Sequence, residues 1–290
     1  DMTVYSGDLG MIDGQVNVRN WSIDEGFASN AMVHSGTKHG TDRENGPYDW
    51  TGSFDVYGAV PVWKPGDIVT LDAYKAPDST GDENNGEHYE GDIYIETITI
   101  NVNFQTNEVI NHQVTFGGVG ALNITAGVPI VDPATPANKT PCVGRLVTYV
   151  APGAAPANET IVPHVTTVTL TLTRPAVTSV NSGDSAGVNK CLTVRVPGAA
   201  LDWTMTVATE EGNANTLLVP GSNHMMRLYI DATLCFDFKW SHLATITGLT
   251  VDVESGAIIS QTYNFEMKAT LAGVLGEVKT PGPVTLWPAP

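Results

Sequence analysis

Hydrophobic and polar residues alternate over residues 92–116, DIYIETITINVNFQTNEVINHQVTF. In the first part of this segment, every second residue from Ile98 to Phe104 is apolar. In the second part, Ile110, His112, Val114 and Phe116 share one face, and the polar residues 105–108 separate the two parts. Alternation with a period of two among β-branched and aromatic residues predicts two strands joined by a tight turn.

The same pattern returns about half a chain later, in ATITGLTVDVESGAIISQTYNF, residues 244–265. Aligning the two segments pairs Ile110 with Ile259, Val114 with Tyr263 and Phe116 with Phe265. An Asp-Trp-Thr sequence begins a strand-like stretch in each half, at residues 49–51 and 202–204. A Pro-Gly pair follows in each half, at residues 65–66 and 220–221. The chain therefore looks like two copies of one β module.

The remaining segments predict further short strands and long loops, and no apolar residues recur with a helical period. We expect strands at residues 11–21, 48–60, 68–74, 165–173, 201–209 and 225–230, with a short edge strand at 144–150. We expect loops at residues 35–47, 78–91 and 179–190, and a turn at the Gly-rich residues 117–122. Little helix is expected.

The predicted fold class is all-β, with two tandem related β-sandwich or partial-barrel domains. Because the chain has 290 residues, each copy is long enough to bury a core of its own. We place the first domain at residues 1–130, an Ala/Pro/Gly-rich linker at 131–163, the second domain at 164–280, and a Pro-rich C-terminal arm at 281–290.

The charge balance argues against nucleic-acid binding by charge neutralisation. The formal net charge is -17, from 14 Lys and Arg against 31 Asp and Glu. Phosphate backbones are bound largely by cations, so ordinary DNA or RNA binding is not expected, although a merely solubilising acidic surface explains the charge as well. Cys142, Cys191 and Cys235 have no regular spacing, which favours a reducing compartment. The first ten residues are polar and acidic, so we expect no signal peptide, and no apolar run suggests a membrane partner.

The acids Asp82, Glu83, Glu87 and Glu90 form the strongest candidate cluster. A glycosidase needs two carboxylates held by rigid elements on opposite sides of a sugar, whereas acids on a Gly/Asn-rich loop are usually solvated. The cluster lacks the spacing of an EF-hand, and whether residues 78–91 bind Ca²⁺ stays open.

The histidines and tryptophans point to core packing more than to chemistry. His34 and His39 are a weak metal suggestion, while His112 lies on a predicted core-facing position. Trp50 and Trp203 could stack on sugars, but their matched positions among apolar residues favour the core. No nucleophile elbow or phosphate-binding loop occurs. We therefore expect no enzyme, no catalytic residue, no cofactor and no metal site.

With these segments in view, the chain resembles the tail-tube (major tail) proteins of long-tailed bacteriophages. The resemblance is carried by the Asp-Trp-Thr strands, the Pro-Gly pairs and the hairpin ending TNEVINHQVTF. It implies a β-sandwich or partial barrel whose copies join into stacked hexameric rings, or trimeric, pseudo-six-fold rings for a tandem form. It further implies a virion protein of the phage tail, assembled in the host cytoplasm, which contacts other virion proteins and lets genomic DNA pass without specific binding.

Two other classes of protein stay open. A capsid decoration or cement protein would also be acidic, mostly β and built from two modules. A secreted carbohydrate-binding or hydrolytic module would need a signal peptide or a cleft with paired carboxylates, and the sequence indicates neither.

Overall fold

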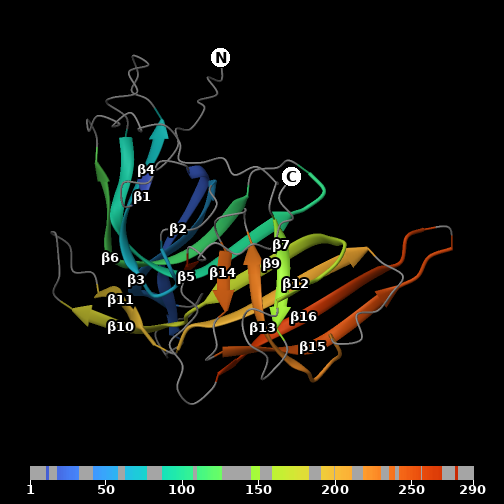
Figure 1. Cartoon of the computed structure of the whole chain (residues 1–290). Helices are drawn as coiled ribbons and strands as arrows, with labels where there is room; N and C mark the ends of the chain where they lie inside the picture. Colours follow the sequence, from blue (N-terminus) through green and yellow to red (C-terminus); the bar gives the residue numbers. More distant parts are fainter. Residues whose placement is uncertain are drawn as a thin grey trace.

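The structure is a computed structural model that describes residues 11–12, 18–32, 42–57, 63–76, 87–106, 110–125, 145–150, 159–182, 191–198, 200–210, 218–229, 235–238, 242–255, 257–269 and 278–279. These residues form strands and connections without a helix, so the all-β prediction is confirmed (Figure 1). In this part of the chain there is accordingly no helix that could cross a membrane. The strands are β1 (Met11–Ile12), β2 (Val18–Met32), β3 (Asp42–Tyr57), β4 (Ile68–Ala76), β5 (Glu87–Asn103), β6 (Asn111–Thr125), β7 (Leu146–Val150), β8 (Thr160–Ile161), β9 (Val165–Thr173), β10 (Ala176–Ser182), β11 (Cys191–Pro197), β12 (Asp202–Glu210), β13 (Asn223–Tyr229), β14 (Cys235–Phe238), β15 (His242–Asp252), β16 (Ser260–Ala269) and β17 (Val278–Lys279).

One large antiparallel sheet runs through both halves of the chain. Its strand order is β2-β3-β6-β5-β9-β12-β16-β15-β13. The long strand β5 has two neighbours on the same side, because its first part pairs with β4 and its last part pairs with β9. Strand β9 thereby joins β5 of the first half to β12 of the second half.

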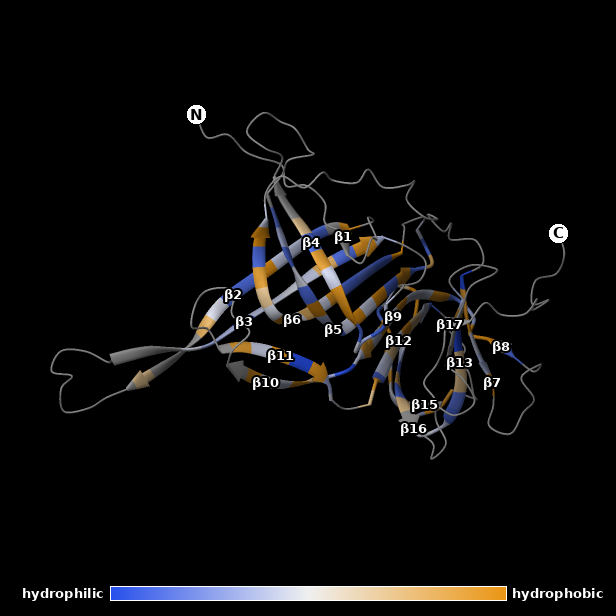
Figure 2. Ribbon diagram, turned by 90° about the vertical axis from the view of Figure 1, so that its left-hand side faces the viewer, coloured by the Kyte–Doolittle hydropathy of each residue, from blue (hydrophilic) through white to orange (hydrophobic). Residues whose placement is uncertain are grey.

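One face of this sheet is the apolar core, and the alternation seen in the sequence decides which residues lie on it (Figure 2). A row of paired residues crosses both halves on this face, and all of its members are buried: Val56, His112, Ile100, Leu170, Met205, Phe265 and Ile246. His112 is 1 % exposed, so its predicted core position is confirmed. Trp50 and Trp203 are buried as well, which removes them as exposed sugar platforms.

A smaller sheet, in the order β8-β7-β13-β14-β17, packs on the apolar face of the second half. Figures 1 and 2 show β7 and β13 as a separate layer over β9, β12 and β16. Val147 and Leu228 of this layer belong to the same core cluster as Met205 and Tyr263. The expected edge strand at residues 144–150 is therefore wrong in one respect: β7 pairs on both sides, and its residues are buried. The range 131–163, expected as a linker, contains both β7 and β8.

All four expected loops and turns are partly strand, because tertiary pairing extends the hairpins beyond the apolar alternation, and the first residues of the expected loop 179–190 belong to β10. β3 begins at Asp42 and β5 begins at Glu87. The Gly-rich residues 117–122 are not a turn but part of β6. Their glycines admit large neighbours, since a Cβ atom on Gly118 would lie 2.0 Å from Cε2 of Trp50. The residues 13–17, 33–41, 77–86, 107–109, 126–144, 183–190 and 281–290 lie outside the described residues.

Four strands of each half match in order and register. The order β3-β6-β5-β4 of the first half corresponds to β12-β16-β15-β13 of the second. Phe54 pairs with Val114 as Val207 pairs with Tyr263, which is the alignment expected from the sequence. Both central hairpins are irregular at the same place, between Ile95 and Thr97 and between Ile246 and Gly248.

The Pro-Gly turns match as well. Gly66 and Gly221 have positive φ angles of 102° and 87°, a region that favours glycine. The Gly66 N–H donates to the Ile95 carbonyl and the Gly221 N–H donates to the Ile246 carbonyl, both at 2.8 Å. The halves differ afterwards: β4 stays on β5 along its length, whereas β13 leaves β15 after two residue pairs and enters the small sheet.

Candidate functional site: the polar face and the central junction

The face of the large sheet opposite the core is polar across both halves. One row of paired residues on this face crosses nine strands, and each residue has a polar side chain: Asn20, Asp55, Gln113, Thr99, Thr171, Thr204, Glu266, Thr245 and Asn223. None of these residues is buried. Because side chains alternate across a strand, the core pattern itself dictates this second surface.

Hydrogen bonds between side chains join neighbouring strands on this face. The hydroxyl groups of Ser22 on β2 and Ser53 on β3 lie 2.9 Å apart. The Thr169 hydroxyl on β9 donates to the Asn101 side-chain carbonyl on β5 at 2.9 Å. The Thr206 hydroxyl on β12 donates to Asn264 on β16 at 3.2 Å. Cross-strand pairs of short polar side chains of this kind stabilise the sheet.

The charged residues in this row of nine are of one sign. The row above carries the acids Asp55 and Glu266, and no Lys or Arg side chain belongs to that row. Asp24 and Asp252 are exposed on the outer strands β2 and β15. A row of this composition offers a phosphate backbone hydrogen-bonding groups but no counter-charge.

The two halves meet at the central junction, which we define as Thr97–Asn103 of β5 paired with Thr167–Thr173 of β9. The buried residues of β5 at this junction, Ile98, Ile100 and Val102, are no more than 1 % exposed. The backbone bonds continue beyond the ladder, because the Phe104 N–H donates to the Thr166 carbonyl at 2.8 Å and the Arg174 N–H donates to the Glu96 carbonyl at 2.9 Å. The central junction is thus a continuous antiparallel pairing of β5 with β9, and its core-facing side is buried.

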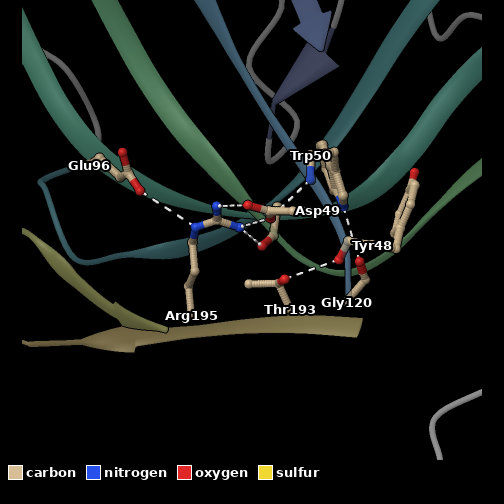
Figure 3. A network of polar contacts seen from close by, with 8 residues as sticks. Tyr48, Asp49, Trp50, Glu96, Gly120, Thr193 and Arg195 are labelled. Carbon is tan, nitrogen blue, oxygen red and sulfur yellow. Dashed lines mark hydrogen bonds and ion pairs between the residues drawn. The ribbon is translucent and has the colours of Figure 1, made fainter. Parts of the chain in front are cut away.

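The hairpin β10–β11 of the second half also reaches over the first half, where Arg195 fixes it (Figure 3). The Arg195 guanidinium donates to both carboxylate oxygens of Asp49, at 2.7 and 2.9 Å, and to the Gly118 carbonyl at 2.6 Å. Its Nε lies 3.5 Å from the Glu96 carboxylate. Paired, bidentate bonds of this kind are the strongest polar contacts a buried arginine makes.

Tyr48 lies at the same contact. Its carbonyl accepts a hydrogen bond from the Thr193 hydroxyl at 3.0 Å, and its own hydroxyl donates to Glu25 at 2.8 Å. Burial of the phenol, followed by the bond to the Glu25 carboxylate, raises the pKa of Tyr48 well above its ordinary value. This tyrosine therefore stays a neutral donor throughout the physiological range.

Of the four acids and the His34–His39 pair singled out for chemistry, Glu87 and Glu90 alone fall within the described ranges. Asp82, Glu83, His34 and His39 lie outside the described residues, and Glu87 and Glu90 belong to strand β5. No group of three or more His, Cys, Asp or Glu side chains suited to a metal ion occurs within the described ranges. The question whether residues 78–91 bind Ca²⁺ stays open, since most of that segment is outside those ranges.

Sequence reasoning missed the buried polar contacts of His88 and Arg195. His88 is buried, with its Nε2 4.0 Å from the Asp72 carboxylate. Burial raises the pKa of Asp72, and the neighbouring His88 partly offsets this. Arg195 was missed as well, and the only sequence signal was a cation in the middle of an otherwise apolar and β-branched strand, CLTVRVP.

No protein-family model matches the chain, and no curated protein sequence matches it.

Proposed function

We propose that this chain is a structural protein of a bacteriophage tail, which self-assembles into stacked rings that form the tail tube. The observation that carries the proposal is the central junction. Two strand groups of the same order and register are joined edge to edge by β5 and β9, so that one sheet and one polar face cross both. A protein that closes a ring from sheets needs this mode of joining.

We infer that the two groups are copies of one module. The matched registers, bulge positions and Pro-Gly turns support this, because unrelated hairpins rarely agree in all three. Each chain then supplies two units, and three chains supply the six units of a pseudo-six-fold ring.

The polar face would line the conduit. Its threonine, asparagine and glutamine side chains hydrate well, and its acids repel the phosphate backbone. Genomic DNA would therefore pass without specific binding, while other virion proteins would bind the ends of the tube. The chain would be assembled into the virion tail in the host cytoplasm.

Negative-stain microscopy of the purified chain at increasing concentration tests this proposal. Rings or tubes of uniform diameter are the expected result, accompanied by a concentration-dependent increase in sedimentation coefficient. A monomer or small oligomer that stays unchanged at high concentration, and binds only when capsids are added, would replace the tail-tube assignment with a capsid decoration protein.

A further inference from the structure

The central junction has an unpaired counterpart at two edges of the large sheet, one along β2 and one along the part of β15 that β13 does not cover. In the matched registers, β15 of the second half corresponds to β5, and β2 of the first half corresponds to β9. Residues 248–254 therefore correspond to Thr97–Asn103, and residues 20–26 correspond to Thr167–Thr173. The edge of β5 that pairs with β9 therefore corresponds to an edge of β15, and a strand equivalent to β2 could pair with that edge.

These two edges are open in the part of the chain that the structure describes. Residues 248–252 of β15 pair with β16 on one side, and residues 22–26 of β2 pair with β3 on one side. No other described strand lies against them. Unpaired edges of this length are sites where a further strand can add.

The exposed apolar residues on β15 point to the missing neighbour. Ile100 and Val102 at the central junction are 0 % and 1 % exposed, whereas their counterparts Val251 and Val253 are 49 % and 71 % exposed. A strand that pairs with β15 in the way that β9 pairs with β5 would cover Val251 and Val253. The apolar residue it would bring opposite Val251 is Ile23, which corresponds to Leu170.

We propose that β15 of one copy pairs antiparallel with β2 of a second copy, in the register of β5 with β9. In this intermolecular seam Thr250 stands opposite Asp24, Val251 opposite Ile23, and Asp252 opposite Ser22. The proposal rests on the proposed function, since it names the surfaces through which the chain self-assembles. A chain with both edges joins neighbours head to tail, which closes a ring or continues as a filament.

Charge makes the seam weaker than the central junction. The positions of Asp24, Glu25, Asp252 and Glu254 in the seam correspond to Thr171, Leu172, Asn101 and Asn103 in the junction. Four acids thus replace four neutral residues. None of them directly faces another acid, but Asp24 and Asp252 lie diagonally across the seam on its polar face, where like charges oppose pairing and salt screens them. The seam therefore forms at high ionic strength or high protein concentration, and the soluble chain is protected from premature assembly.

Disulfide cross-linking between two different single variants tests the register. One chain carries Asp24→Cys and the other carries Thr250→Cys, so only a contact between copies can link them. The counterpart hydroxyls of Thr99 and Thr171 lie 3.5 Å apart, which places this pair directly opposite each other. The control mixes Thr250→Cys with Ser22→Cys, two residues out of register. Opposite residues are within disulfide reach and diagonal ones are at or beyond its limit, so about tenfold more of the 24–250 link is expected, identified by mass spectrometry of the linked peptides.

Salt and one further variant complete the test. The yield of the 24–250 link is expected to rise between about 0.01 and 1 M NaCl, because the Debye length shortens about tenfold. Val251→Lys, an exposed substitution that leaves the monomer folded, is expected to abolish both the link and the association. Equal yields from the two cysteine pairs, or association unaffected by Val251→Lys, would overturn the seam. Tubes without the 24–250 link would refute the seam alone, whereas the link in small oligomers that never form tubes would refute the proposed function alone.

Discussion

Arg195→Ala should weaken the attachment of the β10–β11 hairpin to the first half of the sheet. The side chain of Arg195 is 5 % exposed and carries two bonds to Asp49, one to the Gly118 carbonyl and an ion pair with Glu96. Removing one partner of a buried ion pair typically costs about 3–5 kcal/mol. The Asp49 and Glu96 side chains are 43 % and 37 % exposed and can be rehydrated, so we expect a loss of about 3 kcal/mol.

Urea denaturation followed by circular dichroism measures this loss. Lys64→Ala is the matched control, because it removes the same charge from an exposed residue and should change the free energy of unfolding by less than about 0.5 kcal/mol. Arg195→Lys should lie between the two, since an ammonium group cannot reproduce the two parallel bonds to Asp49. A double-mutant cycle with Asp49→Ala should show a coupling of about 1–3 kcal/mol. A loss below about 1 kcal/mol for Arg195→Ala would show that the hairpin is held by other contacts.

Three further predictions concern the core and the buried polar groups. Gly118→Ala should destabilise the protein by about 1–3 kcal/mol or prevent folding, because the new methyl group would overlap the Trp50 indole. Gly26→Ala is the control and should be neutral, because a Cβ atom there would have no neighbouring atom within 4 Å. Thermal melting followed by tryptophan fluorescence distinguishes the two variants. The raised pKa of Tyr48 keeps its phenol protonated in the folded state, whereas the same phenol in the unfolded chain ionises near pH 10.0. The contribution of Tyr48 to the free energy of unfolding is therefore complete below that pH and declines above it. Tyr48→Phe should flatten the decline in urea titrations at alkaline pH, and an unchanged slope would contradict the assignment. Glu159→Ala should cost about 3–5 kcal/mol, since the 3 % exposed carboxylate pairs with Arg227 and accepts bonds from Thr148 and Tyr229; Glu159→Gln should cost less, and equal unfolding free energies for both variants would argue against the role of these bonds.

Local alternation determined the strands and their faces. Val165–Thr173 was predicted with the same bounds that β9 has in the structure, and the inward positions of Trp203, Met205 and Val207 are confirmed. This succeeds because side chains alternate across any strand, so the apolar residues of a half-buried strand mark its buried face wherever its neighbours lie. The correspondence of Val114 with Tyr263 was likewise visible in the sequence and agrees with the observed registers.

Only the tertiary structure decided which edges meet. Nothing in the local pattern of Thr97–Asn103 and Thr167–Thr173 shows that these strands, one from each half, pair with each other, because strand pairing between distant segments depends on the whole arrangement of layers. The same limit explains why the local pattern predicts a turn at the Gly-rich end of β6: its glycines are required by the indole of Trp50 and the guanidinium of Arg195, which come from distant parts of the chain. The sequence determined the surfaces of each strand, and long-range packing determined how those surfaces are joined.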